Sequence, residues 1–283
     1  MSQLPITVYS PESSLASPTK MLRDMFRDLA AGRELAFRLA VRDIKAQYRQ
    51  ALLGILWAFI LPLANTVTWL FLSKSGIVKV SDTGLPYPVY VFTGTMLWAI
   101  FMDALNAPMQ QVNNSKSMLS KLNFPREALI VSGIYQTLFN ASIKVGLMLA
   151  ALLFMGITPG WSLLLVPVAI LSLVLVGSAL GMLITPVGLL YGDIGRALPL
   201  LMQFFMYLTP VVFPMPQTGW AATLFNLNPL TPLILTSRDW LTDKTPSMLA
   251  EFLVVNALAA CLLLMVWAVY RLAMPILIER MGG

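Results

Sequence analysis

The chain has 283 residues, of which 58% are hydrophobic and 11% are charged, whereas soluble proteins carry about 25% charged residues. This composition excludes an ordinary soluble domain and predicts a bundle of membrane helices. The net charge of +6 does not indicate nucleic acid, because eight of the 19 Lys and Arg residues lie in residues 20–49, where anionic lipid is the nearer partner. The absence of histidine removes the commonest general base and metal ligand, and the single cysteine, Cys261, excludes an intrachain disulfide.

The first 49 residues are predicted to form a tail followed by a surface helix. Residues 1–32 are interpreted as a disordered cytoplasmic tail, because the first 19 are rich in Ser and Pro and lack the basic-then-apolar pattern of a signal peptide. Residues 33–49 are predicted to be an amphipathic helix in the membrane interface. Its apolar stripe at helical spacing is Phe37, Val41, Ile44 and Tyr48. Its cations repeat that spacing one position later, at Arg38, Arg42, Lys45 and Arg49.

Six membrane spans are predicted from runs of about 20 apolar residues between charges. In chain order they are roughly residues 51–73, 86–109, 128–155, 161–189, 197–213 and 248–270. With the N-terminus in the cytoplasm, the inner segments carry 14 Lys and Arg residues and the outer loops carry 4. The positive-inside rule therefore predicts that both termini are cytoplasmic.

Two connections between the predicted spans are unusual. The inner loop at 110–127 is polar and compatible with a helix. The outer segment at 214–247 is long, rich in Pro and partly apolar. We expect it to form short helices that dip into the outer leaflet, with their backbone shielded by protein or by a water-filled cavity.

Several residues inside the spans allow two interpretations. Lys144 either extends to the outer interface or faces a hydrated conduit beside Asn140 and Gln136, and Asp103 has the same ambiguity. The small residues of the Gly177-xxx-Gly181 spacing serve either packing within the protein or a seam between subunits. The many aromatic residues form either interface belts or, in part, a conduit for a sugar polymer, whose C–H faces pack on rings.

Motifs for chemistry are missing from the sequence. There is no GxxxxGK[ST] loop for nucleotide binding and no GxSxG motif for a serine hydrolase. Work against a gradient would therefore need energy from a partner. A membrane-embedded enzyme would need convergent carboxylates or histidine. Only Asp103 and Asp193 lie near the inner side, and neither is expected to pair with a second carboxylate.

Five short segments follow one another in an informative order. They are Arg42 through Arg49 with Leu53 through Ala58 and Pro62; Tyr87-Pro88 with Gly94 and Trp98; Lys121 through Glu127; Tyr191 with Asp193; and Pro210 through Pro214 with Asn228-Pro229-Leu230. Together they resemble the ABC type-2 permeases that export polysaccharides, the membrane subunits of O-antigen, capsule and teichoic-acid exporters. The resemblance covers roughly residues 33–275. One departure is Gly192, where the family often has a basic residue before the aspartate.

The resemblance implies an all-α membrane protein with six transmembrane helices, preceded by the amphipathic interfacial helix. Residues 50–275 would be the transmembrane domain of a homodimer around a central conduit in the bacterial inner membrane. Each copy would bind a separate ABC ATPase subunit that holds ATP and Mg, so this chain would need no cofactor or metal and would not be an enzyme. The expected cargo is a lipid-linked polysaccharide. A drug or lipid exporter is the alternative, and a glycosyl- or acyltransferase or a scaffold is less favoured.

The resemblance also implies roles for particular residues. Residues 113–122 would be the coupling helix, and the ATPase contacts would be Asn113, Lys116, Ser117, Lys121, Phe124, Arg126 and Glu127. The cations where the lipid-pyrophosphate enters would be Arg38, Arg42 and Arg49. Spans one and five would line the conduit, whose expected residues are Trp57, Phe59, Trp69, Phe204, Tyr207, Phe213 and Lys144. Residues 214–246 would form the periplasmic gate.

Overall fold

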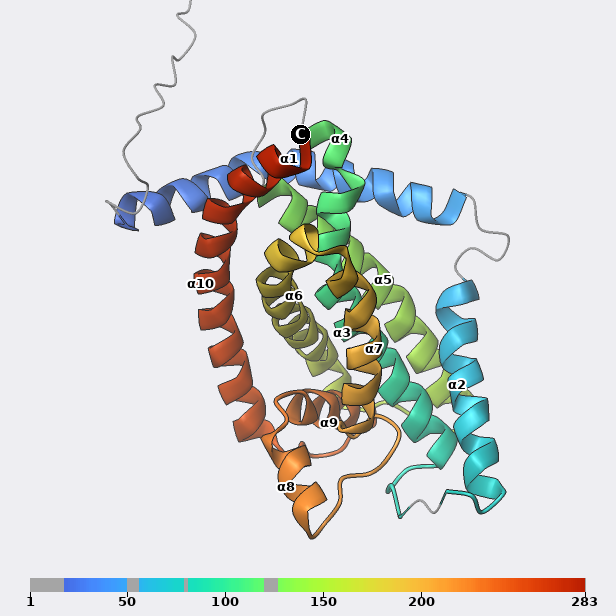
Figure 1. The fold of residues 1–283 in the computed structure, drawn as a ribbon. Coiled ribbons are helices and arrows are strands. Elements are labelled where there is room, and N and C mark those ends of the chain that lie inside the picture. Colours follow the sequence, from blue (N-terminus) through green and yellow to red (C-terminus); the bar gives the residue numbers. More distant parts are fainter. Residues whose placement is uncertain (1–17, 50–55, 79–80, 120–126, 283) are drawn as a thin grey trace, which may run out of the picture.

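A computed structural model of the chain describes residues 18–49, 56–78, 81–119 and 127–282. Within these ranges every regular element is a helix, as predicted. Figure 1 shows one long helix, α1, lying across the top of a bundle of steeply inclined helices, with the short helices α8 and α9 near the bottom. We call these the α1 end and the α8 end of the molecule.

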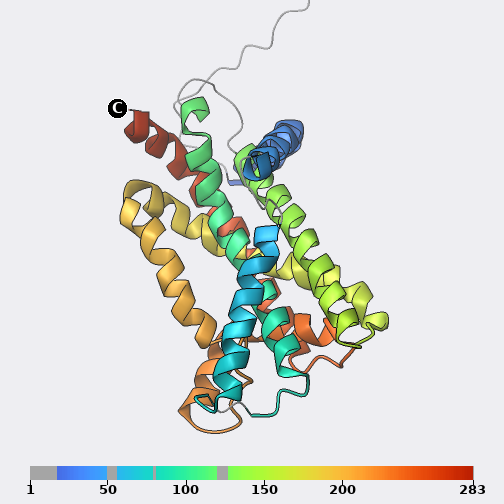
Figure 2. The same cartoon turned by 90° about the vertical axis from the view of Figure 1, so that its right-hand side faces the viewer.

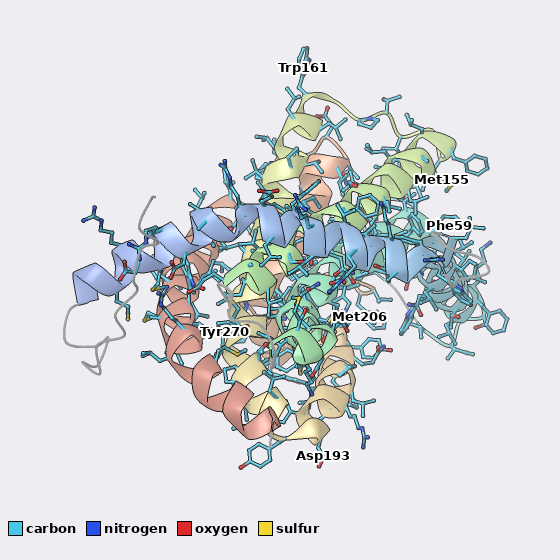
Figure 3. The ribbon with its side chains drawn as sticks, turned by 90° about the horizontal axis from the view of Figure 1, so that it is seen from above. Phe59, Met155, Trp161, Asp193, Met206 and Tyr270 are labelled. Atoms are coloured by element: carbon cyan, nitrogen blue, oxygen red, sulfur yellow. The ribbon has the colours of Figure 1, made fainter. Side chains whose placement is uncertain are left out.

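Helix α1 spans Pro18–Arg49 and is longer than the predicted surface helix. It therefore includes residues 18–32, which were predicted to belong to the tail; residues 1–17 lie outside the described residues. Seen from above, α1 crosses the width of the bundle (Figure 3). Its buried positions, such as Met25, Ala36 and Leu39, recur at helical spacing in both halves. This continuous stripe, which packs against α5, explains why the helix begins so early.

Six further helices occupy the positions of the predicted spans. They are α2 (Trp57–Lys74), α3 (Tyr87–Asn114), α5 (Glu127–Phe154), α6 (Val166–Leu190, preceded by the 3-10 helix η3, Trp161–Leu165), α7 (Gly192–Tyr207) and α10 (Leu249–Gly282). Among the described residues, four helices are long and apolar enough to cross a membrane, at residues 87–114, 127–154, 161–190 and 249–274. Helices α2 and α7 have 18 and 16 residues, so the six-span count stays a prediction.

The centre of the bundle is formed by α3 and α6, which approach each other closely at two glycines. A Cβ atom on Gly177 would lie 2.8 Å from the carbonyl oxygen of Phe101, and one on Gly181 would lie 2.3 Å from that of Leu105. Both distances are too short for any side chain, so only glycine permits this packing. The Gly177-xxx-Gly181 spacing thus serves packing within the chain, which was the first of its two interpretations.

The end of α7 departs from the prediction that span five reaches residue 213. The helix ends at Tyr207, and residues 208–213 form turns. The carbonyl groups of Pro210 and Val211 do not continue a helix, because they accept hydrogen bonds from Arg238. The following segment, which was predicted to lie outside, contains two short helices, α8 (Trp220–Leu227) and α9 (Leu230–Leu241).

Candidate substrate passage

Two cavities adjoin between the helices, one with a mainly polar lining and one with a mainly apolar lining that also holds charged and amide side chains. The first, which we call the vestibule, has a volume of about 640 Å³ and lies between α1, α3 and α5. Its polar lining residues are Arg42, Asp43, Gln47, Asp103, Asn106, Gln110, Asn114, Gln136, Thr137 and Asn140. The second, the span cavity, has a volume of about 580 Å³ and lies between the end of α1 and helices α2, α3, α5 and α7. Its lining includes Tyr48, Trp57, Asn65, Trp98, Lys144, Gln203 and Met206.

The two cavities share Gln47, Asp103 and Asn140. At this junction the Nζ atom of Lys144 donates a hydrogen bond to Oδ2 of Asp103 over 2.6 Å. The Lys144 side chain is 8% exposed and that of Asp103 is 33% exposed. Lys144 therefore lines the span cavity beside Asn140 and does not extend to the end of its helix, while its place in a hydrated conduit stays a prediction. The ion pair was not predicted from the sequence, in which the two charges are 41 residues apart.

Amide side chains connect the helices around the junction. Gln111 donates to Gln136 over 2.8 Å, and Gln136 in turn donates to Gln47 over 3.2 Å. The Tyr48 hydroxyl donates to Oδ1 of Asn140 over 3.2 Å. Burial, together with the nearby negative charge of Asp103, raises the pKa of Tyr48, so its hydroxyl remains a donor at neutral pH. These bonds tie the end of α1 to α3 and α5.

The three cations predicted to receive the substrate have different surroundings. Arg42 lines the vestibule, and its Nε atom donates to Oδ1 of Asp43 over 2.7 Å. Arg38 pairs with Glu34 over 2.6 Å on the exposed face of α1. Arg49 is exposed at the end of that helix. Of the three, only Arg42 lines either cavity.

The aromatic residues predicted to line the conduit do not all share one surface. Trp57 lines the span cavity, and Phe204 is 69% exposed on α7. Trp69 joins α2 to the end of α7, with ring centroids 5.9 Å from Tyr207 and 5.0 Å from Phe213.

Phe59 faces a different part of the molecule. Its ring contacts Phe92 at 5.8 Å and lines a separate apolar groove between α2, α3 and α5. In the view from above, Phe59 lies apart from Met206 of the span cavity (Figure 3). The structure therefore brings Trp57 and Lys144 together on the span cavity and leaves Phe59 outside it.

The predicted coupling segment begins where α3 ends at Asn114 and continues in α4 (Lys116–Leu119). Figure 2 shows α4 projecting from the α1 end of the bundle. Asn113 and Lys116 are exposed, and Ser117 lies in α4. The predicted contacts Lys121, Phe124 and Arg126 lie outside the described residues.

Glu127, also predicted to contact an ATPase, is buried instead. Its Oε1 atom accepts a hydrogen bond from Arg271 of α10 over 2.9 Å, and its side chain is 7% exposed. Arg271 also donates to Asp28 of α1 over 2.6 Å. Glu127 is thus part of an ion-pair network that joins α1, α5 and α10 and does not face outward. From the sequence, Asp28 was given no role and Arg271 was counted only among the inner charges.

The α8 end is closed by a buried cation that the sequence analysis counted only as an outer charge. Arg238 of α9 is 2% exposed. Its guanidinium donates to the carbonyl oxygens of Pro210, Val211 and Tyr90 over 2.9, 3.1 and 3.3 Å. It also lies 3.7 Å from the centre of the Tyr90 ring. Burial lowers the pKa of Arg238 while Tyr90 opposes that change, and a guanidinium stays charged under such conditions.

These features define a class of protein: a helical membrane protein with charged cavities among its apolar spans. Such cavities mark substrate or ion pathways, because intramembrane charge is costly without a function. Among the described residues, no group of three His, Cys, Asp or Glu side chains could hold a metal ion. The charged cavities among the apolar spans are typical of membrane transport proteins.

The chain belongs to the ABC-2 type transporter family, which it matches over residues 34–239. It is 25% identical to the O-antigen export system permease protein RfbA of Myxococcus xanthus, over 86% of this chain and 93% of that protein. It is 23% identical to the protein of the same name from Klebsiella pneumoniae, over 72% and 78% of the two chains. It is 22% identical to the polysialic acid transport protein KpsM of Escherichia coli, over 78% and 85%.

Proposed function

We propose that this chain is the permease subunit of an ATP-driven exporter that moves a lipid-linked polysaccharide, O-antigen or capsule-like, across the bacterial inner membrane. The observation that carries the proposal is the pair of cavities leading from α1 into the spans, found in a member of the ABC-2 type transporter family. The names of the relatives support the substrate class. Both termini would be cytoplasmic, so the α1 end would face the cytoplasm.

The working unit would be a homodimer of six-span subunits with two copies of an ABC ATPase, which bind ATP and Mg. Exposed apolar side chains on α7, such as Leu200, Phe204 and Phe205, support a partner surface there. Spans one and five, which are α2 and α7, would line the conduit between the two copies. Helices α8 and α9 would form the outer gate.

Coupling would occur at α4 and the segment that follows it. ATP closes the ATPase subunits, and α4 transmits that motion to α3 and α5. The exposed Asn113 and Lys116, with Ser117, support this docking surface; Lys121, Phe124 and Arg126 would complete it. Glu127 would instead support the surface from within, through Arg271.

The first test is a pull-down of the full chain from its native membrane in a gentle detergent, with mass spectrometry of bound proteins and lipids. We expect one ATPase subunit per permease and a lipid-linked glycan. Recovery without any ATPase would contradict the exporter assignment. Recovery of an ATPase with a different lipid or a drug-like molecule would replace the polysaccharide by that substrate.

A second test addresses the coupling surface with the double variant Lys116→Glu and Lys121→Glu. The reversed charges should separate ATP hydrolysis from export, so glycan should accumulate inside the cell while the ATPase stays active. Lys74→Glu, at the exposed end of α2, is the matched control and should export normally. Unchanged export in the double variant would refute the coupling assignment.

A further inference from the structure

We propose that the junction of the two cavities binds one neutral sugar unit of the substrate, through Gln47, Asp103, Asn140 and Lys144. The inference rests on the proposed function and adds to it a binding site and a ligand class. The four residues come from three helices, α1, α3 and α5, and the first three line both cavities. A ligand passing from the vestibule to the span cavity would therefore contact all three of these helices.

The charges around the junction favour a neutral ligand. The charged residues that line the two cavities are Arg42, Asp43, Asp103 and Lys144. Each cation is already paired with a carboxylate, over 2.7 Å for Arg42 with Asp43 and 2.6 Å for Lys144 with Asp103. The lining thus has two positive and two negative charges, without the excess cation that a phosphate group would need.

The uncharged lining residues have the hydrogen-bonding chemistry of a sugar. A carboxamide side chain both donates and accepts, as a sugar hydroxyl does. The amides that line the vestibule are Gln47, Asn106, Gln110, Asn114, Gln136 and Asn140. Some of these amides already bond within the protein, and their remaining donors and acceptors match a ring with hydroxyl groups in several directions better than they match a lipid tail.

The ion pair itself supplies the strongest bonds in the site. A carboxylate or ammonium group forms hydrogen bonds roughly twice as strong as those between neutral groups. Asp103 is the more exposed partner, so its carboxylate can accept from a hydroxyl while Lys144 remains beside it. Asp103 and Lys144 need not move apart when the sugar binds, because one sugar hydroxyl can bond to both groups.

Aromatic rings complete the site on the side of the span cavity. Trp57 of α2 and Trp98 of α3 both line this cavity. Trp98 is largely buried, whereas Trp57 is 48% exposed, so the Trp57 ring is the one that suits the C–H surface of a sugar ring whose edge hydroxyls would reach the junction. Each cavity is within the range of about 300–1,000 Å³ that is usual for small-molecule sites, which fits a single sugar unit at a time.

The experiment measures cysteine labelling in a Cys261→Ser background, using the full permease–ATPase complex in membrane vesicles with the cytoplasmic face outward. Asn140→Cys and Asn106→Cys are treated with a membrane-impermeant sulfonate thiol reagent, alone or with a neutral trisaccharide of glucose, mannose or galactose. We expect labelling of both variants, and a rate about tenfold slower at position 140 when a trisaccharide is present at ten times its Kd. Lys45→Cys, on the exposed face of α1, should label at the same rate with and without sugar.

Three results would overturn the inference: no labelling at positions 106 and 140, equal labelling with and without every trisaccharide, or protection by inorganic pyrophosphate alone. If Asn140→Cys does not assemble, protection of Asn106→Cys decides the question in the same way. The failure of this site is distinct from the failure of the exporter assignment. If the sugars give no protection but the pull-down recovers a glycan, only the sugar site is refuted. If the sugars give no protection and the pull-down recovers no glycan, the exporter assignment is refuted.

Discussion

Two buried cations, Arg238 and Lys144, lie in different parts of the bundle and have partners of different kinds. At the α8 end, Arg238 is surrounded by the carbonyl groups of a fixed turn and by the Tyr90 ring. Lys144, in contrast, pairs with a carboxylate at the edge of a cavity. The first cation has partners that belong to the backbone, while the second has a partner that can also bind something else.

The different partners of Arg238 and Lys144 indicate which of the two regions is the more rigid. Releasing Arg238 would leave a buried charge without partners and would remove the guanidinium donor from the Val211 carbonyl group, which is costly in an apolar setting. Releasing Lys144 would expose it to a cavity whose amides and any bound hydroxyls replace the lost bond. We therefore expect the contacts around Arg238 to be rigid and the contacts at the junction to change when a ligand binds.

The largest effect is expected from Arg238→Met, which keeps the apolar stem and removes the guanidinium. The Val211 carbonyl group loses the Arg238 donor, and the Pro210 carbonyl group keeps only the bond from the Tyr90 hydroxyl. A buried carbonyl group that loses its donor costs about 1–3 kcal/mol, so the lost bonds together should lower the free energy of unfolding by about 3 kcal/mol. Thermal unfolding of the purified protein in detergent, followed by size-exclusion chromatography, measures the loss.

The controls for this variant separate charge from geometry. Arg196→Met removes an exposed guanidinium near the start of α7 and should leave the unfolding temperature nearly unchanged. Arg238→Lys keeps the charge but loses the forked donor set, so it should also be strongly destabilised. If Arg238→Met changes the unfolding temperature as little as Arg196→Met does, the bonds from Arg238 are not needed for stability.

Gly94→Ala tests the packing around Arg238 from the side of α3. A Cβ atom there would lie within 3 Å of backbone and guanidinium atoms, 2.2 Å from the Val211 carbonyl oxygen and 2.4 Å from Arg238. Overpacking of this kind costs about 1–3 kcal/mol. Gly146→Ala in α5, where a Cβ would meet nothing within 4 Å, should instead raise stability slightly, by about 0.5–1 kcal/mol. Equal unfolding temperatures for the two variants would contradict the close approach.

The positions of most helices were predictable because long apolar runs lie between charges and turn residues. Hydropathy was less informative about where each helix ends. Helix α3 continues to Asn114, beyond the predicted end at 109, because polar residues can extend a helix past the membrane. Helix α7 ends at Tyr207 because backbone groups of the next residues bind Arg238, and that partner is distant in the sequence.

The site was predictable only in its parts. Asp103 and Lys144 each stood out as a charge in a span, but they are 41 residues apart, and nothing local indicates that they meet. Arg238 contacts residues 27 to 148 positions away and was therefore counted simply as an outer charge. Contacts of this kind depend on which helices are neighbours, and hydrophobic periodicity does not contain that information.

A double-mutant cycle sharpens the comparison at the junction. Asp103→Asn and Lys144→Met should each destabilise the protein, because each leaves one charge without its partner. The double variant should lose less than the sum, with a coupling energy of about 1 kcal/mol, since polar contacts between membrane helices are of this size. The free energies come from thermal unfolding of the four proteins. Additive losses would mean that the two groups do not interact in the folded protein.

The smallest effect is expected from Arg38→Ala, which removes the exposed pair with Glu34 on α1. Both side chains are about three-quarters exposed, at 75% and 74%, so water and salt compete with the bond. A pair of this kind in a helix contributes about 0.3–0.5 kcal/mol, which is an order of magnitude less than the loss expected at Arg238. If Arg38→Ala lowers the unfolding temperature as much as Arg238→Met does, the exposure of a cation does not predict how much it contributes to stability in this protein.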